Sequence, residues 1–223
     1  CSFFLVSAVV VTTLFGSVPQ AAFAGDVNEG AAAQADAAWA DGIKDEALVA
    51  EHKAVWMDTS KTVEERVQAL LACMTLEEKA AQMVQAEQGG TAGNTPATPE
   101  DVKTYGLGSI LSGGGSAPPT GNSAEDWKLR VNEYKAAALL SRLGIPLIYG
   151  VDGVHGHNNV DNAVIFPHNI GLGAANDAEL TKKVGAAAAE EIRATGIQWT
   201  FAPTLGVPES ERWGRFYECF SDD

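Results

Sequence analysis

The chain has 223 residues, of which 46% are hydrophobic and 20% are charged. This composition is ordinary for a globular protein and allows a sizeable core in one or two domains. The formal net charge of -14 argues against nucleic acid and anionic membrane as partners, because no basic patch is visible that would neutralise phosphates. A net charge of this size is compatible with a neutral substrate, or it serves only to keep the protein soluble.

The chain opens with a predicted secretory signal. No charged residue precedes Asp26, and the apolar run is too short and too often interrupted by small polar residues to indicate a membrane span. Residues 22–24 form the A-x-A pattern of a cleavage site, so residues 1–24 are expected to be removed, and the signal is expected to start upstream of Cys1. A lipid-modified Cys1 is the alternative. The mature protein, without a membrane span, is expected in the periplasm or outside the cell.

The mature chain keeps two cysteines. Cys73 falls in a helical pattern, and Cys219 lies near the end of the sequence. Export permits a disulfide, but the spacing does not indicate one, and we expect two buried free thiols.

Helical signals begin after a loosely patterned leader. Residues 25–60 are rich in Ala, Asp and Gly with weak periodicity, and we expect them to be partly ordered at best. Beyond them, apolar residues recur at helical spacing, and a second helix restarts where Thr75 and Glu78 have the spacing of a capping box. The predicted buried stripe of the first helix comprises Val63, Val67, Leu70 and Leu71. That of the second helix comprises Leu76, Ala80, Met83 and Val84.

The rest of the chain alternates strands and helices. Ser123 with Asp126 marks the start of one helix, and Asn176 or Asp177 caps another. This alternation predicts parallel βα units with functional loops after the strands. The predicted strands are 107–111, 147–151 and 199–202, and the predicted helices are 123–142 and 179–194. The apolar stripe of the last helix comprises Leu180, Val184, Ala188 and Ile192.

The segment YGVDGVHGHNNV, residues 149–160, carries a polar cluster after the second predicted strand. A metal site, an ordinary polar loop and a ligand pocket are the three alternatives. A metal site would need His155, His157 and His168, but this loop spacing lacks the helical spacing of zinc hydrolases, and the thiols lie far away in sequence. We therefore expect neither a metal nor another cofactor, and we expect the histidines to bond to backbone or to polar neighbours.

Two other motif classes are excluded. The glycine-rich loop SGGGSAPPTG, residues 112–121, lacks the G-K-[ST] of a phosphate loop. The sequence contains no G-x-S-x-G motif, so it gives no indication of a serine hydrolase. The glycine-rich loop is best described as a tight, proline-stiffened connection at the carboxyl end of a strand.

Asp152 closes the second predicted strand, where side chains of parallel βα proteins face the ligand. A carboxylate there can accept two hydrogen bonds from neighbouring hydroxyls of a sugar, whereas the alternative is a loop aspartate bonded to nearby backbone amides. Arg215 is the natural second contact to a sugar. Trp213 beside it could stack under a sugar ring, although we expect it to pack in the core.

Several motifs in consistent order resemble glycoside hydrolase family 3, in its β-glucosidase and exo-β-glucanase branch. They are DGVHGHNNV, IFPHNIGLGA, EEIRATGI, FAPTL and RWGRFYECFSDD, preceded by MTLEEKAAQM and GSILSGGGSAP. The β-N-acetylglucosaminidase branch typically shows a different sequence in place of DGVHG. The chain departs from the family pattern before RWGR, where residues 208–211 read PESE instead of a basic–acidic pair.

The resemblance implies an α/β fold, a (β/α)8 TIM-like barrel of which residues 61–223 are the N-terminal part, followed by a second α/β sandwich domain. It implies exo-hydrolysis of terminal β-D-glucosyl residues with retention, on a β-linked glucosyl oligosaccharide or glucoside. Asp152 and Arg215 would grip hydroxyls of the terminal sugar. The residues expected to shape the pocket wall are His155, His157 and Asn158, with Trp213 as a further candidate.

By the same resemblance, the nucleophile and the acid/base lie beyond Asp223. The chain is then an N-terminal fragment that depends on the missing C-terminal part of the same polypeptide and is inactive by itself. A non-catalytic sugar-binding or structural remnant of the same fold is the alternative, and a metal-dependent hydrolase is a third hypothesis.

Overall fold

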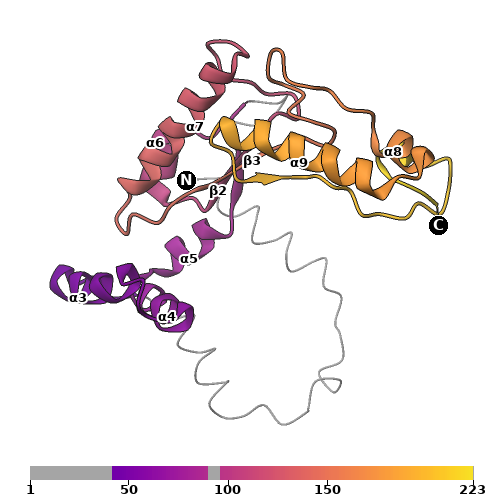
Figure 1. Cartoon of the computed structure of the whole chain (residues 1–223). Coiled ribbons are helices and arrows are strands. Elements are labelled where there is room, and N and C mark those ends of the chain that lie inside the picture. The colour runs from indigo at the N-terminus through magenta and orange to yellow at the C-terminus, as the bar shows by residue number, and fades with distance from the viewer. Residues whose placement is uncertain (1–41, 90–95, 223) are drawn as a thin grey trace, which may run out of the picture. The chain divides into compact units, whose positions relative to one another are not determined.

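The computed structural model describes residues 42–89 and 96–222, all within one compact unit, Asp41–Asp223. The predicted signal, residues 1–24, lies outside the described residues, as does the first part of the predicted leader. Four parallel strands form one sheet in the order β1-β2-β3-β4 (Figure 1). The strands are β1 (Gln85–Glu87), β2 (Ser109–Ser112), β3 (Ile148–Val151) and β4 (Trp199–Thr200).

Helical crossovers connect the strands, because parallel neighbours cannot be joined by a tight turn. The crossovers are α6 (Pro99–Tyr105) between β1 and β2, α7 (Ala124–Leu139) between β2 and β3, and α8 (Asn169–Ala175) with α9 (Ala178–Ala194) between β3 and β4. The predicted alternation is confirmed, and so are both long helices. The three-residue β1 and the seven-residue α6 were missed, since neither is long enough to show a period.

The main core lies on one face of the sheet. Trp127, Val131 and Tyr134 recur along one side of α7 and are fully buried against Tyr149 and Val151 of β3. Val102 of α6 and Ile192 of α9 join the same cluster. Ile148, which points to the opposite face, is 52% exposed. Helices on one face of a parallel sheet form the outer layer of a (β/α)8 barrel, which confirms the predicted fold class.

The segment 25–60, expected to be partly ordered at best, contains one regular helix among its described residues, 42–60. Helix α3 (Glu46–Met57) is capped by Asp45 and packs against α4 (Val63–Cys73). Trp56 of α3 is buried in a second cluster with Cys73 of α4. Val49 and Val55 of α3 also pack half-buried against this cluster.

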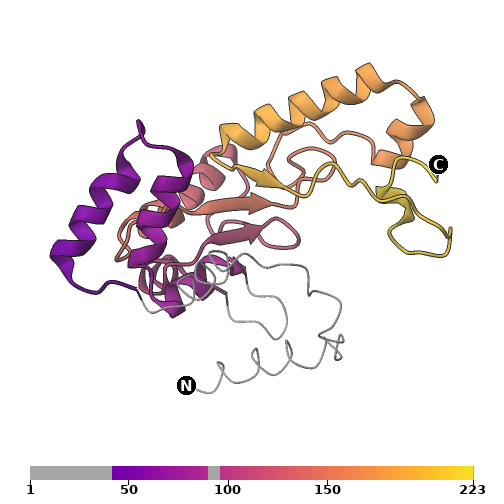
Figure 2. The ribbon, with the colours of Figure 1, turned by 90° about the horizontal axis from the view of Figure 1, so that it is seen from below.

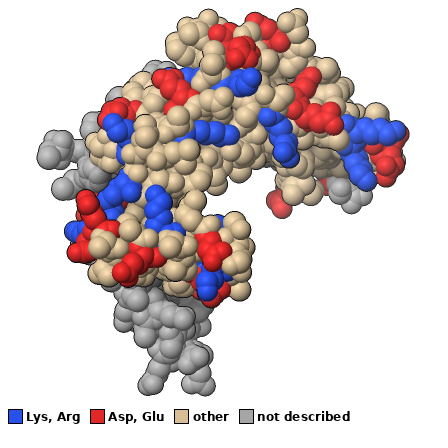
Figure 3. Space-filling model, turned by 60° about the vertical axis from the view of Figure 1, so that its left-hand side comes forward, with Lys and Arg blue, Asp and Glu red and all other residues tan. Residues whose placement is uncertain are grey.

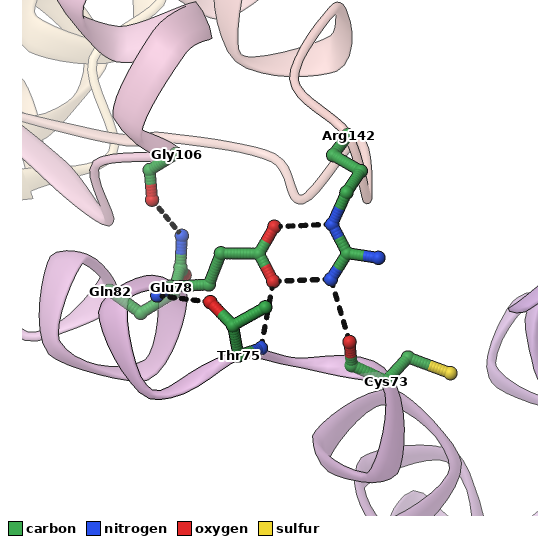
Figure 4. A network of polar contacts seen from close by, with 6 residues as sticks. All are labelled: Cys73, Thr75, Glu78, Gln82, Gly106 and Arg142. Carbon is green, nitrogen blue, oxygen red and sulfur yellow. Dashed lines mark hydrogen bonds and ion pairs between the residues drawn. The ribbon is translucent and has the colours of Figure 1, made fainter. Parts of the chain in front are cut away.

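The predicted helix restart is confirmed, but its predicted buried face is wrong. Thr75 and Glu78 form a capping box at the start of α5 (Leu76–Gln82). Polar side chains attach this helix to the rest of the protein, where Glu78 pairs with Arg142 and Gln82 donates to the carbonyl of Gly106 (Figure 4). The apolar residues predicted to be buried on α5 are exposed instead, namely Leu76 (45%), Met83 (81%) and Val84 (43%). The predicted stripe of α4 is confirmed in part: Leu70 and Leu71 pack half-buried against the second cluster, whereas Val63 (74%) and Val67 (42%) are exposed.

Other sequence expectations have mixed outcomes. Cys73 and Cys219 are buried free thiols, as predicted. Asp177 caps α9, whereas Asn176 ends α8 in a left-handed conformation. Among the described residues, none of the helices has the length and apolar character that crossing a membrane requires. Acidic and basic side chains are interspersed on the face in Figure 3, with no broad basic surface there.

Candidate functional site

The candidate site lies at the carboxyl edge of the sheet, where parallel strands end together (Figure 2). The backbone amide of Asp152, directly after β3, donates to the carbonyl of Ser112 at 3.0 Å. Asp152 is a half-buried residue, and its carboxylate accepts no hydrogen bond from another described residue. Among the described residues, no backbone amide donates to this carboxylate, which argues against the alternative of a loop aspartate bonded to nearby amides. Within the described part of the chain, both carboxylate oxygens are left as acceptors for a ligand.

Glycines after β2 make room for this carboxylate. A Cβ at Gly114 would lie 3.1 Å from Oδ2 of Asp152, and one at Gly113 would lie 2.7 Å from the side chain of Val151. Gly113 also has a φ of 90°, which disfavours any side chain there. The glycine-rich loop thus approaches Asp152 closely, with only hydrogen atoms at its nearest Cα positions.

Two asparagines brace the loop after β3. The Asn158 amide, oriented so that its nitrogen meets acceptors, donates to the carbonyl of Asp152 at 3.0 Å. Asn159 donates from Nδ2 to the carbonyl of Gly113 at 2.7 Å, which joins the loops after β2 and β3. Asn158 therefore acts on the backbone that carries Asp152. The role of Asn159 was missed, although two adjacent asparagines after a strand are typical of a side-chain-braced loop.

His155 and His168 lie together, away from His157. Their rings stack with centroids 4.0 Å apart, and His168 also meets the ring of Tyr217 edge-on at 4.7 Å. Nδ1 of His155 lies 2.9 Å from the carbonyl of Phe166. Burial, together with the neighbouring His155, lowers the pKa of His168. The three imidazoles do not converge on one point, and those of His155 and His157 bond to backbone or polar neighbours, as predicted.

His157 is part of the core, with 1% of its surface exposed. Thr195 donates from Oγ1 to the carbonyl of Ile192 at 2.8 Å, so Nε2 of His157 must be the donor in its own 2.9 Å bond to Thr195. Burial lowers the pKa of His157 to about 4, which keeps the ring neutral. Its edge-on contact with Trp127 completes the packing. His157 can shape a pocket only indirectly, by fixing the loop to the end of α9.

Arg215 presents an exposed guanidinium near Asp152. Its Nε lies 3.0 Å from Oε1 of Glu218, and its Nη2 lies 2.6 Å from Oε2. This pairing with Glu218 raises the pKa of Arg215, and the charge of Asp152 raises it further. The two predicted sugar contacts are thus brought within electrostatic reach of each other. Glu218 was missed, although opposite charges three positions apart are a recognisable signal.

Trp213 does not pack in the core, so that expectation is wrong. The residue is 46% exposed and lies in the turns that precede η2 (Phe216–Glu218). The reason is local: the described residues after β4 form turns and one short helix, and they offer no sheet or long helix to cover the ring. Leu205 and Val207 in the same segment are also exposed.

Residues 75–223 match the model of the glycosyl hydrolase family 3 N-terminal domain. The chain belongs to glycosyl hydrolase family 3. This confirms the resemblance and agrees with the parallel sheet and its single helical layer, because the N-terminal domain of this family is TIM-barrel-like.

The relatives of this family 3 chain include β-glucosidases and an exo-glucanase. A lysosomal β-glucosidase of Dictyostelium discoideum is 35% identical over 172 residues, which are 70% of this chain and 20% of the relative. The crystal structure of an exo-1,3/1,4-β-glucanase from a Pseudoalteromonas species is 46% identical with a TM-score of 0.65, over 74% of this chain and 20% of that protein. A periplasmic β-glucosidase of Salmonella typhimurium is 38% identical over 38% of this chain and 10% of its own length. The chain thus spans a fifth or less of each of these relatives.

Proposed function

We propose that this chain supplies part of the glucose-binding pocket of a retaining, exo-acting β-glycosidase, which hydrolyses terminal β-D-glucosyl residues of oligosaccharides or glucosides in carbohydrate catabolism. One observation carries the proposal: the Asp152 carboxylate lies at the carboxyl edge of a parallel sheet, within reach of the charge of Arg215, and no described residue donates a hydrogen bond to it. Family membership and the relatives named β-glucosidase and exo-glucanase support the substrate class.

The two side chains are chemically complementary to a sugar. A hydroxyl group both donates and accepts, so Asp152 can accept from neighbouring hydroxyls while the guanidinium of Arg215 donates to a hydroxyl oxygen. Charge-assisted hydrogen bonds of this kind are stronger than neutral ones. The pair can therefore hold and orient one sugar ring without a metal or another cofactor.

The proposal assigns binding to these residues and chemistry to others. Retaining hydrolysis needs a carboxylate that attacks the anomeric carbon and an acid that protonates the leaving oxygen. We assign both to sequence beyond Asp223, in the rest of the barrel and the second α/β domain, since the relatives are about five times longer than the matched part. The predicted signal, together with a relative named periplasmic, supports export to the periplasm or the extracellular space.

Replacement of Asp152 by Ala in the full-length enzyme tests the proposal. We expect kcat/KM for an aryl β-glucoside to fall by at least about a hundredfold, because contacts to sugar hydroxyls strengthen in the transition state. Asp161→Ala, at an exposed aspartate of the same loop, is the matched control and should leave the kinetics unchanged. Near-normal kinetics for Asp152→Ala would remove Asp152 from the site.

A further inference from the structure

Building on the proposed function, we propose that Glu218 is the residue that positions Arg215. In this role Glu218 holds one edge of the guanidinium, so that the opposite edge faces the sugar hydroxyls in a fixed orientation. Glu218 does not touch the substrate.

The geometry of the pair determines which donors remain for a ligand. Nε of Arg215 donates to Oε1 of Glu218 at 3.0 Å, and Nη2 donates to Oε2 at 2.6 Å. A guanidinium has five N–H groups in a fixed planar fork, so a pairing through Nε and Nη2 leaves both N–H groups of Nη1 and one of Nη2. The remaining N–H groups point within the guanidinium plane, away from the edge that Glu218 occupies, and can bind hydroxyl oxygens.

The two partners differ in burial, which shows which one orients the other. The Glu218 side chain is 11% exposed, whereas that of Arg215 is 66% exposed. An exposed arginine has many rotamers, and holding it in one of them costs conformational entropy unless a fixed partner restricts it. Glu218 is the fixed partner, and Arg215 takes its orientation from it.

The anchor of Glu218 is helix α8. The buried Asn169 donates from Nδ2 to the carbonyl of Glu218 at 2.8 Å. The backbone after Glu218 also approaches this helix so closely that a Cβ at Gly173 would lie 1.7 Å from the carbonyl oxygen of Phe220. The backbone that carries the Glu218 carboxylate is therefore held against helix α8.

The same contacts argue against a role for Glu218 as a proton donor. Both of its carboxylate oxygens are paired with Arg215, and this pairing lowers the pKa of Glu218 despite its burial. A carboxyl group that stays ionised at neutral pH cannot protonate a leaving oxygen. Its effect on catalysis must pass through Arg215.

A double-mutant cycle in the full-length enzyme tests this role. Glu218→Gln should lower kcat/KM for an aryl β-glucoside and the affinity for glucose, measured by calorimetry, by about tenfold or more, because it replaces one acceptor of a charge-assisted pair by a donor. In an Arg215→Ala background the same substitution should change either quantity by less than about twofold. Glu218→Asp, which keeps the charge, should recover part of the loss. Glu211→Gln, an exposed glutamate before the same turn, is the matched control and should behave as wild type.

The outcomes separate this inference from the proposed function. The inference would be overturned if Glu218→Gln lowered kcat/KM and glucose affinity as much in the Arg215→Ala enzyme as in the wild type. Glu218 would then act on the fold independently of the arginine. Normal kinetics for Glu218→Gln beside an impaired Arg215→Ala enzyme would also overturn the inference. Normal kinetics and glucose affinity for Arg215→Ala itself would overturn the sugar-binding role of Arg215 and the positioning role together. If Glu218→Gln does not fold, Glu218→Asp in both backgrounds gives the same comparison.

Discussion

The candidate site contains one acceptor, Asp152, and one donor, Arg215, which differ in how far the described residues already bind them. Asp152 has no hydrogen-bonding partner for its carboxylate among the described residues, whereas two nitrogens of Arg215 are bound by Glu218. Under the proposed function, a sugar would bind a carboxylate that no described residue engages and a guanidinium whose orientation Glu218 already restricts. Such preorganisation of a donor reduces the cost of ordering the side chain when substrate binds.

Arg215→Lys should not be a mild substitution in the full-length enzyme. An ammonium group cannot pair with both oxygens of Glu218 and present a planar fork to a hydroxyl at the same time. We expect a loss of about tenfold or more in kcat/KM, with weaker glucose binding. A Lys variant that kept both turnover and glucose affinity would show Arg215 to be structural. Arg212→Lys, at an exposed arginine of the same loop, is the matched control.

His157 should make the folded protein sensitive to acid. The folded protein keeps this ring neutral down to a pKa of about 4, whereas an unfolded histidine binds a proton below about 6.5. Between these values the unfolded state binds more protons, so the free energy of unfolding should decrease as the pH falls from about 6.5 to 4, by at most about 3 kcal/mol. Urea unfolding at several pH values measures this slope.

The control for this slope is substitution of the histidines one at a time. His157→Gln, which can still donate to Thr195, should flatten the slope. His52→Gln in α3 leaves His157 in place, so the pH dependence of the free energy of unfolding should be unchanged. An unchanged slope in the His157→Gln protein would contradict the assignment of acid sensitivity to this residue.

At the scale of elements, α5 is attached by polar contacts instead of by an apolar face. Arg142 bonds to both oxygens of Glu78, at 2.7 and 2.5 Å, and to the carbonyl of Cys73 at 2.7 Å (Figure 4). The same Glu78 carboxylate closes the capping box at the start of the helix. One guanidinium thereby joins the end of α4, the start of α5 and the segment after α7.

Arg142→Ala should therefore destabilise the protein more than loss of an ordinary surface charge. We expect a decrease of about 1–3 kcal/mol in the free energy of unfolding, because three charge-assisted contacts are lost at a partly exposed site. Lys128→Ala removes an exposed pair with Glu125 at 3.6 Å and should cost about 0–1 kcal/mol. Urea unfolding of both variants provides the comparison, and equal effects would mean that the network adds nothing beyond a surface ion pair.

At the scale of the whole molecule, the described residues leave apolar surfaces open. Strands β1 and β4 each pair on one side only within the described part of the chain. The apolar stripe of α9 borders an open groove of about 470 Å³ shared with Leu172 and Phe220. Phe201 after β4 is 46% exposed. Unpaired edges and uncovered apolar faces favour aggregation or dependence on further sequence.

The 223-residue chain, expressed without any further sequence, should hydrolyse no aryl β-glucoside. A (β/α)8 barrel takes about 250 residues, and the proposed roles of Asp152 and Arg215 include neither attack nor protonation. An assay of this chain beside the full-length enzyme provides the measurement, with purity confirmed first. Turnover within about a thousandfold of the full-length enzyme would show that a carboxylate in this chain, Asp152 first, is the nucleophile.

The sequence by itself determined the features that depend on near neighbours. The capping boxes at Thr75 and Ser123 were predictable because each involves residues three positions apart. The parallel alternation and the place of Asp152 at a strand end followed from short periodic segments and the turns between them. Signals of this kind persist whatever packs against the segment.

Only the tertiary structure decided which surfaces are buried and which charges pair. The apolar stripe of α5 is exposed and its polar side is engaged, because Arg142 arrives from a segment more than sixty positions later in the chain. His157 is core rather than pocket wall because Thr195 of the α9 end meets it. The position of Glu218 beside Arg215 depends on α8, because Asn169 of that helix donates a hydrogen bond to the backbone carbonyl of Glu218. Each outcome depends on a contact between distant segments, and periodicity carries no information about such contacts.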